Sequence, residues 1–202
     1  MRKTIIAFVG EMASGKGLAA ELLAKRGYSL YVLSARVKEQ LVFQGIPETR
    51  ETKIRMANRL REEYGTDALM EMTDHLVRED PNSRIIIDGI RNEGEIDYLQ
   101  NEYGENNVFV IGIKADFETQ WERLQKRGRE GDPKTREEFE RLIKFENGEG
   151  QKQSSQQIAA CMRRASLTIE NKGNSSVELG KRLKAGLVSL GIEGQTRQKE
   201  RR

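Results

Sequence analysis

The strongest constraint on how this chain folds is the run GEMASGKG at residues 10–17, which follows the pattern G-x-x-x-x-G-K. The residues before it, Thr4 to Val9, are mostly apolar and rich in β-branched and aromatic side chains, which predicts a buried strand. Residues 18–25 have the composition of a helix, and Gly27 follows as its C-terminal stop. This order of strand, glycine-spaced loop and helix predicts a backbone whose N–H groups point inward at a helix N-terminus.

Lys16 is the residue that indicates what kind of ligand this loop binds. A glycine-rich turn explains Gly10 and Gly15, but the helix dipole disfavours a lysine at a helix start unless an anion lies there too. We therefore expect a phosphate-binding loop in which Lys16 reaches the outer phosphates of a nucleotide. The loop residues predicted to bind it are Gly10, Ala13, Ser14, Gly15, Lys16, Gly17 and Leu18.

Position 17 departs from the usual pattern. Ser or Thr normally follows the lysine and holds Mg²⁺, whereas this chain has Gly17. The metal is therefore expected to be held through water and by a carboxylate elsewhere. Asp88 is the candidate, because it ends the apolar run 84–88, and ligands of open parallel sheets bind at the carboxyl ends of the strands. A turn aspartate that simply ends a strand is the alternative.

The composition narrows the class of protein. Of the 202 residues, 33% are charged and 36% are hydrophobic, which predicts a compact core under an ionic surface. Much of the net charge of +3 lies in the tail, at Arg197, Lys199, Arg201 and Arg202, so the body lacks the charge of a nucleic-acid binder. We expect small-molecule partners rather than nucleic acid or a membrane.

The chain has too few cysteines and histidines for an internal disulfide or a zinc site. The single cysteine, Cys161, excludes an internal disulfide and is expected to be a buried apolar position, and one histidine leaves no zinc site. No apolar run is long enough to cross a bilayer, and no cleavage-site pattern follows the first strand. These features predict a cytoplasmic protein, as a monomer or a homodimer.

Strands and helices alternate along the chain. Further strands are expected at 28–33, 84–88, 108–113 and 167–169, and helices at 35–43 (capped by Ser34), 48–79 with a break at Gly65, 93–101, 116–126, 135–147, 156–164 and 175–190. The alternation predicts a three-layer α/β sandwich with a mostly parallel five-stranded sheet. The helical block between the second and third strands is too long for a simple crossover, so we expect a substrate-side subdomain there. The loop at 127–133 is expected to be mobile, and the tail from Gly191 onward to be disordered.

Four motifs together resemble one superfamily. They are residues 10–17, DGIR at 88–91, RLQKRGR at 123–129 and IENKG at 169–173. The chain is similar, from its first strand to about Leu187, to the P-loop nucleoside-monophosphate kinases, a group that includes adenylate, deoxynucleoside-monophosphate and dephospho-CoA kinases. The resemblance implies a P-loop kinase domain at 1–190, with a helical acceptor-binding insert at 34–80, a lid at 127–150 and a separate basic tail at 191–202.

The resemblance also implies roles for residues outside the loop. Asp88 would orient Mg²⁺ through water, and Asn171 and Gly173 would lie by the base of ATP. Arg123, Arg127 and Arg129 would act with Lys16 and Asp88 as catalytic residues on or beside the lid, and Asp132 would anchor the closed lid by an ion pair. Plain alternatives stay open: a simple turn at 171–173, and arginines that pair with the nearby Glu122 and Glu130.

The acceptor side matches the family less well. Arg91 follows the third strand where the family binds the acceptor phosphate, although a surface pair with Glu93 or Glu95 is the alternative. Ser34, Arg36 and Lys38 follow the second strand, where relatives carry Asp-x-x-Arg and this chain has Ala35 and Lys38. A lysine lacks the bidentate fork of arginine, which puts this element in doubt. Arg59 and Arg61 in the helical block are expected on a solvated face.

These residues predict a kinase that uses ATP and Mg²⁺ to phosphorylate a nucleoside or deoxynucleoside monophosphate. One alternative is an enzyme like dephospho-CoA kinase, which phosphorylates a ribose hydroxyl. The other is an ATP-binding regulatory protein with weak catalysis, which is suggested by Leu18 where adenylate kinases carry Thr and by the altered acceptor element.

Overall fold

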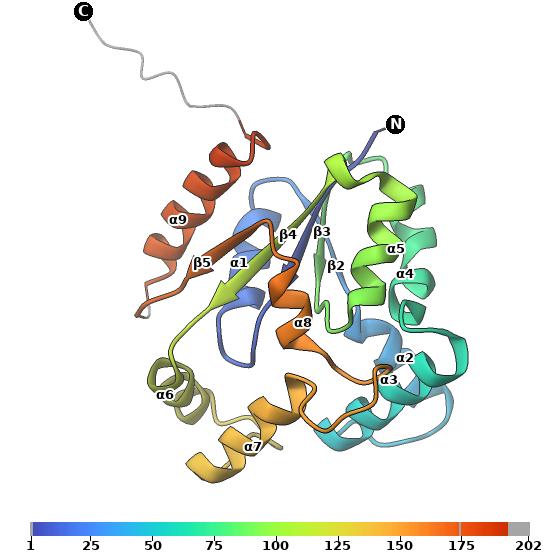
Figure 1. The fold of residues 1–202 in the computed structure, drawn as a ribbon, viewed down its shortest axis with the longest axis vertical. Helices are drawn as coiled ribbons and strands as arrows, with labels where there is room; N and C mark the ends of the chain where they lie inside the picture. Colours follow the sequence, from blue (N-terminus) through green and yellow to red (C-terminus); the bar gives the residue numbers. More distant parts are fainter. Residues whose placement is uncertain (1, 174, 194–202) are drawn as a thin grey trace, which may run out of the picture.

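The computed structural model describes residues 2–173 and 175–193. Its centre is a five-stranded sheet in the order β2-β3-β1-β4-β5, and each neighbouring pair is parallel (Figure 1). The strands are β1 (Thr4–Val9), β2 (Ser29–Val32), β3 (Arg84–Asp88), β4 (Val108–Lys114) and β5 (Leu167–Glu170). The three-layer α/β sandwich is confirmed, with a sheet that is parallel throughout.

Strand β1 lies in the middle of the sheet because its side chains are apolar on both faces. Ile5 and Val9 join one hydrophobic cluster while Ile6 and Phe8 join the other, as the two-residue period of a strand requires. The register pairs Phe8 with Asp88 at the end of β3. The glycine-spaced loop and Asp88 therefore leave the sheet at the same edge.

Helices cover both faces of the sheet (Figure 1). On one face lie α1 (Lys16–Ala24) and α9 (Ser176–Ser189), whose leucines and alanines pack against Ile6 and Phe8. The cluster on the other face takes residues from α2 (Ser34–Phe43), α3 (Arg50–Tyr64), α4 (Ala68–Glu79), α5 (Glu93–Tyr103) and α8 (Ile158–Arg163), and a short 3₁₀ turn spans Glu105–Asn107. Cys161 is fully buried in this cluster, as expected.

The block between β2 and β3 is helical, as expected, with its break at Gly65 (φ 113°). One local expectation was wrong. Helix α2 begins at Ser34 itself because Leu33 already has helical angles (φ −58°, ψ −33°), so Ser34 does not cap the helix.

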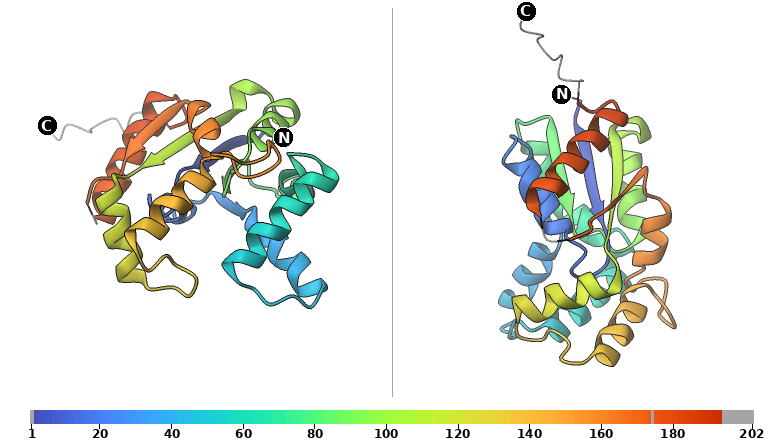
Figure 2. Two further views of the ribbon diagram at one scale, coloured as in Figure 1. Left: turned by 60° about the horizontal axis from the view of Figure 1, so that its bottom comes forward. Right: turned by 90° about the vertical axis from the view of Figure 1, so that its left-hand side faces the viewer.

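Helices α6 (Phe117–Arg127) and α7 (Arg136–Glu146) form a separate arm. Thr135 and Glu138 make a capping box at the start of α7, where the sequence predicts a helix from residue 135. The arm has a small cluster of its own, built on Leu124, Phe139 and Met12 of the glycine-spaced loop. Helices α2 and α3 form a second arm, called the α2–α3 arm below. The two arms lie on opposite sides of the carboxyl ends of the strands (Figure 2).

The beginning of the tail is ordered, contrary to expectation. The carboxylate of Glu193 lies 2.5 Å from Arg26, and Ile192 packs on the cluster of α1 and α9. The remainder of the predicted disordered tail, 194–202, lies outside the described residues. None of the described helices has both the length and the apolar character that a bilayer span needs.

Candidate active site

The loop between β1 and α1 is shaped by close backbone approaches. A Cβ at Gly10 would lie 2.4 Å from the carbonyl oxygen of Ile113, and one at Gly15 (φ 101°) would lie 2.1 Å from Nδ2 of Asn171. Ala13 also adopts a left-handed conformation (φ 57°), which is uncommon for a residue with a side chain. The tight curl predicted from the glycine spacing is therefore present.

Two side chains from distant elements hold this curl from outside. Asn171, which follows β5, donates from Nδ2 to the carbonyl oxygen of Ser14 at 2.8 Å. Arg123 on α6 donates to the carbonyl oxygens of Ala13 and Ser14, both at 3.1 Å, and also to those of Asn171 and Gly173. The carbonyl oxygens of Ala13 and Ser14 are therefore bound by side chains, and these bonds support the curl of the loop.

Lys16 is the first residue of α1, and its ammonium group donates to the carbonyl oxygen of Glu11 at 3.2 Å. Burial, with the nearby Arg91 guanidinium, lowers the pKa of Lys16 to about 8 from its ordinary value of 10.5. Glu146 and Asp88 oppose this shift. The lysine therefore lies where its charge is disfavoured without an anion, as the sequence predicts.

Asp88 ends β3 across from this lysine. Burial raises the pKa of Asp88, although Lys16 and Arg91 lower it. Its Oδ1 atom is buried without a hydrogen-bond partner among the described residues, and a Cβ at Gly17 would lie 4.0 Å from its Oδ2 atom. A single orphaned carboxylate oxygen beside the phosphate-binding loop fits a Mg²⁺ ion that keeps most of its waters and phosphate ligands.

A cleft of about 1760 Å³ opens between the two arms at this edge of the sheet. That exceeds the roughly 300–1,000 Å³ of a site for one small ligand, so two substrates fit. Its lining includes most of the predicted residues, namely Ala13, Gly15, Lys16, Gly17, Leu18, Ser34, Asp88, Arg91, Arg123, Arg127, Arg129, Asn171 and Gly173. Gly10 and Ser14, which belong to the same loop, are buried and are not among the lining residues.

Arg36 and Lys38 were predicted on the acceptor side, but neither is among the lining residues. The guanidinium of Arg36 pairs with Glu39 at 2.5 Å, and the ammonium of Lys38 lies 3.1 Å from Glu48. Since α2 begins at Ser34, it is Ser34 and Val37 that line the cleft. The structure thus corrects the placement of Arg36 and Lys38.

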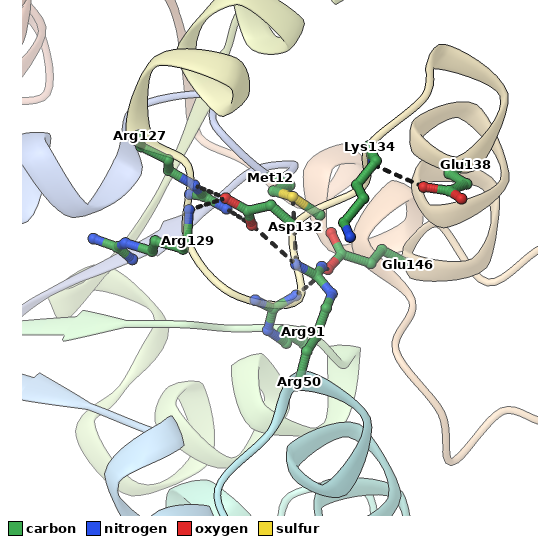
Figure 3. Close-up of polar contacts among 9 residues, drawn as sticks. All are labelled: Met12, Arg50, Arg91, Arg127, Arg129, Asp132, Lys134, Glu138 and Glu146. Atoms are coloured by element: carbon green, nitrogen blue, oxygen red, sulfur yellow. Dashed lines mark hydrogen bonds and ion pairs between the residues drawn. The ribbon is translucent and has the colours of Figure 1, made fainter.

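The predicted lid arginines have different surroundings. Arg127 makes a bidentate pair with Asp132, at 2.8 Å from Nε and 2.6 Å from Nη2. Asp132 thus makes an ion pair, and its role as anchor of a closed lid stays a prediction. Arg129 donates its backbone N–H to the same carboxylate, at 3.2 Å, while its side chain points away from it (Figure 3). Arg123 holds the loop carbonyls described above. A role in catalysis stays a prediction for all three.

Sequence reasoning missed two residues in the middle of the cleft, Arg50 and Glu146. Arg50 is the first residue of α3, and its Nη2 lies 2.8 Å from Oε1 of Glu146, which also lies 3.4 Å from Nη1 of Arg91 (Figure 3). Thr49 caps α3, so Arg50 is a cation at a helix start. The reasoning applied to Lys16 would therefore have identified Arg50 as well.

The solvated face expected for Arg59 and Arg61 is wrong for Arg61. Its side chain is fully buried and donates to Oε1 of Glu95, at 3.2 Å from Nε and 2.8 Å from Nη2. Oε2 of Glu95 accepts the backbone N–H of Arg91 at 2.7 Å. One buried carboxylate thus ties α3 to the turn that carries Arg91. Arg59 is exposed, as expected, and pairs with Glu63.

Comparisons with known proteins identify the family and the fold of this chain. A family model described as an AAA domain matches residues 6–144. A UPF0200 protein of Hyperthermus butylicus is 32% identical over 148 residues, which are 73% of this chain and 78% of that protein. Among solved structures, TT1252 from Thermus thermophilus has a TM-score of 0.60 at 21% identity, covering 94% of this chain and 99% of that one. A shikimate kinase from Aquifex aeolicus has a TM-score of 0.54 at 17% identity, covering 95% and 100%. The chain therefore belongs to the AAA-domain family whose model it matches and to the UPF0200 proteins, and it has the fold of the P-loop kinases.

Proposed function

We propose that this chain transfers the γ-phosphoryl group of ATP to the phosphate of a nucleoside or deoxynucleoside monophosphate. The observation that carries the proposal is that Lys16, Asp88 and Arg91 line one cleft with room for two substrates. Phosphoryl transfer needs little covalent help from a protein. It needs two phosphates in line, positive charge around the moving group, and exclusion of water.

On the donor side, residues 10–18 and Lys16 would hold the β- and γ-phosphates. Asn171 and Gly173 would lie beside the base. Mg²⁺ supplies positive charge to the phosphate oxygens when bound, and Asp88 would hold it through water. Arg127 and Arg129, with the nearby Arg123, would stabilise the charge of the transition state from the lid region at 127–150.

On the acceptor side, the arm at 34–80 supplies Ser34, and Arg91 would bind the acceptor's phosphate as a bidentate partner. Arg36 and Lys38 have no part in this proposal, because neither lines the cleft and each pairs with a glutamate, Arg36 with Glu39 and Lys38 with Glu48. The kinase domain would span 1–190.

The test is a coupled assay of ADP formation with the full chain, ATP, Mg²⁺ and a panel of ribo- and deoxyribonucleoside monophosphates, together with dephospho-CoA. We expect at least one monophosphate to stimulate ADP formation, and Lys16→Met to lower kcat/KM about a hundredfold or more. Lys25→Met is the control, since Lys25 is exposed at the other end of α1.

Phosphorus NMR of the product separates the acceptor classes. A new phosphoanhydride supports the proposal, whereas a new phosphate monoester on dephospho-CoA means a hydroxyl acceptor. ADP formation that never exceeds the acceptor-free rate, with ATP still bound, would instead indicate a regulatory nucleotide-binding protein.

A further inference from the structure

The middle of the cleft holds a carboxylate of the chain itself. Glu146 ends α7 and its side chain is 3% exposed. Its Oε1 atom receives a hydrogen bond from Nη2 of Arg50 and lies close to Nη1 of Arg91, so the two guanidinium groups converge on one oxygen (Figure 3). Gln156 accepts from the same Nη1 of Arg91 at 3.0 Å and fixes its direction.

These three residues come from three parts of the fold. Arg50 belongs to the α2–α3 arm, Arg91 follows β3, and Glu146 belongs to the arm of α6 and α7. Nη1 of Arg50 also lies 3.9 Å from Asp132. The carboxylates of one arm are therefore paired with an arginine of the other, across the space that substrates must enter.

The fit between Glu146 and these arginines is incomplete. Oε2 of Glu146 and Nε of Arg50 are both buried without a hydrogen-bond partner among the described residues. Arg50 thus has a donor that Glu146 does not use, and Glu146 has an acceptor that neither arginine uses. A phosphate group brings three acceptor oxygens and about two charges, and it would satisfy converging guanidinium groups better than one carboxylate.

The position of Arg50 at the start of a helix also favours a bound anion. It lies in the first turn of α3, where the helix dipole already places partial positive charge. Burial lowers the pKa of Arg50, and the neighbouring Arg91 lowers it further, while Glu146 raises it. Two guanidinium groups that approach the same carboxylate oxygen repel each other, so an anion between them stabilises the arrangement.

We propose that Arg50 and Arg91 form the seat of the acceptor's phosphate, and that the carboxylate of Glu146 holds this seat until the acceptor displaces it. The inference rests on the proposed function and adds two points to it. Arg50 is a second arginine for the acceptor's phosphate, and Glu146 is a carboxylate of the chain that competes with this phosphate. Displacement of Glu146 also breaks its ion pair with the α2–α3 arm. Binding of the acceptor then removes a contact between the two arms, so the arms can move more freely relative to each other.

Calorimetric titration of inorganic phosphate into the full chain tests this. Glu146→Gln keeps the volume and an oxygen that can accept from Arg50, but it removes the competing charge. We expect it to bind phosphate about tenfold more tightly than the wild type does. Glu149→Gln is the matched control, because Glu149 is an exposed glutamate in the same segment, and its phosphate affinity should be that of the wild type.

A double variant distinguishes the seat from the phosphate-binding loop. In R50A/E146Q the gain should disappear, because half of the seat is gone. A gain that persists in R50A/E146Q would place the bound phosphate elsewhere and overturn the inference. An E146Q affinity equal to or below that of the wild type would also overturn it, because Glu146 would then be indifferent to the phosphate or would help to bind it.

A crystal of wild-type protein grown with phosphate gives the answer even if E146Q does not fold. Phosphate bonded to Arg50 and Arg91, with Glu146 turned out, supports the inference. Glu146 still on both arginines, with phosphate elsewhere, overturns it. None of these measurements involves turnover, so the seat can be confirmed even if no monophosphate is phosphorylated, and the kinase assay can succeed even if the seat fails.

Discussion

At the scale of single residues, burial controls charge in the cleft. Burial lowers the pKa of Lys16 and raises the pKa of Asp88, so it disfavours the charged form of both groups. Each group gains from a ligand that restores its charge, an anion for Lys16 and a cation for Asp88. This complementarity is the physical reason for ATP with Mg²⁺ as the expected ligand.

The shift at Lys16 predicts how stability depends on pH. The pKa of Lys16 is 10.5 in the unfolded chain and about 8 in the folded protein. Between these two values the unfolded chain binds more protons, so this residue makes the free energy of unfolding rise with pH. Below about pH 8 both states are protonated and the penalty for burying the charge is present in full.

Urea unfolding between about pH 7 and pH 10 measures this rise against a Lys16→Met variant. The comparison with the variant removes the contribution of every other group, so the difference between wild type and variant is the quantity of interest. That difference should change in favour of the wild type as the pH increases. Parallel curves for the two proteins would show that Lys16 is not held in a shifted state.

A second prediction concerns the missing hydroxyl at position 17. Because a Cβ there would lie 4.0 Å from Asp88, Gly17→Ser can place its hydroxyl beside this carboxylate without a clash. We expect the Mg²⁺-dependent affinity for ATP to rise by about 1 kcal/mol, the worth of one hydrogen bond. Gly180→Ser in α9 is the control, since its Cβ would make only ordinary contact with Leu22.

Both serine variants should gain a similar helix propensity, about 0.5 kcal/mol in the free energy of unfolding. Only the first should change the response to Mg²⁺, measured by titrating ATP with and without the metal. An equal response in the two variants would mean that the hydroxyl does not reach the metal position.

The residues found from sequence were those whose role follows from local spacing. Asp88 ends β3 and Lys16 begins α1, and the apolar runs of both elements are unmistakable, so their places at the carboxyl edge of the sheet could be predicted. Arg50 and Glu146 meet only because two arms fold toward each other. Lys38 was predicted from the family pattern, and the start of α2 at Ser34 overrides that pattern.

At the scale of elements, α3 is a charged helix that buries one of its charges. Its inward side carries Met56, Ala57 and Leu60, but the sequence gives no sign of which of its several arginines is buried beside them. Arg61 is the buried one because Glu95 lies opposite it: Oε1 of Glu95 accepts from Arg61, and Oε2 accepts the backbone N–H of Arg91. Local caps such as Thr135 with Glu138 were predictable because both partners lie within one turn.

Removing the buried arginine should therefore be severe. Arg61→Ala leaves Glu95 buried without its partner, and we expect a loss of about 3 kcal/mol or more in the free energy of unfolding. Arg59→Ala is the matched control on the same helix, and it should change little because its pair with Glu63 is exposed. Urea unfolding of both variants decides the matter, and equal losses would mean that the buried pair contributes no more than the exposed one.

At the scale of the whole molecule, residues 2–173 and 175–193 form two clusters on the sheet and a third, small cluster in the arm of α6 and α7. Alternating apolar runs predict the layers, since a strand that is apolar on both faces must be covered twice. The strand order does not follow from the sequence, because placing β3 between β2 and β1 depends on long-range packing. The separate small cluster was not predicted either, as its members are far apart along the chain.

This division predicts that the arm opens by itself. Phe139 is fully buried between Phe117 and Trp121, at ring distances of 5.0 and 5.9 Å, and the cluster meets the rest of the molecule through Met12 and Ala13 of the loop. Removal of a buried phenylalanine ring costs about 3–5 kcal/mol where the whole fold depends on it. Here we expect that loss to appear as local opening, because the strands do not depend on this cluster.

Hydrogen exchange resolved by segment measures the difference. Phe139→Ala should speed exchange in α6 and α7 and leave β1, β3 and β4 as protected as in the wild type. Leu183→Ala, in the cluster of α1 and α9, should instead lower the protection of the central strands. If both variants changed exchange evenly across the chain, the arm and the sheet would open as one unit. The arm could not then close over the cleft independently, and substrates would have to enter a site of fixed shape.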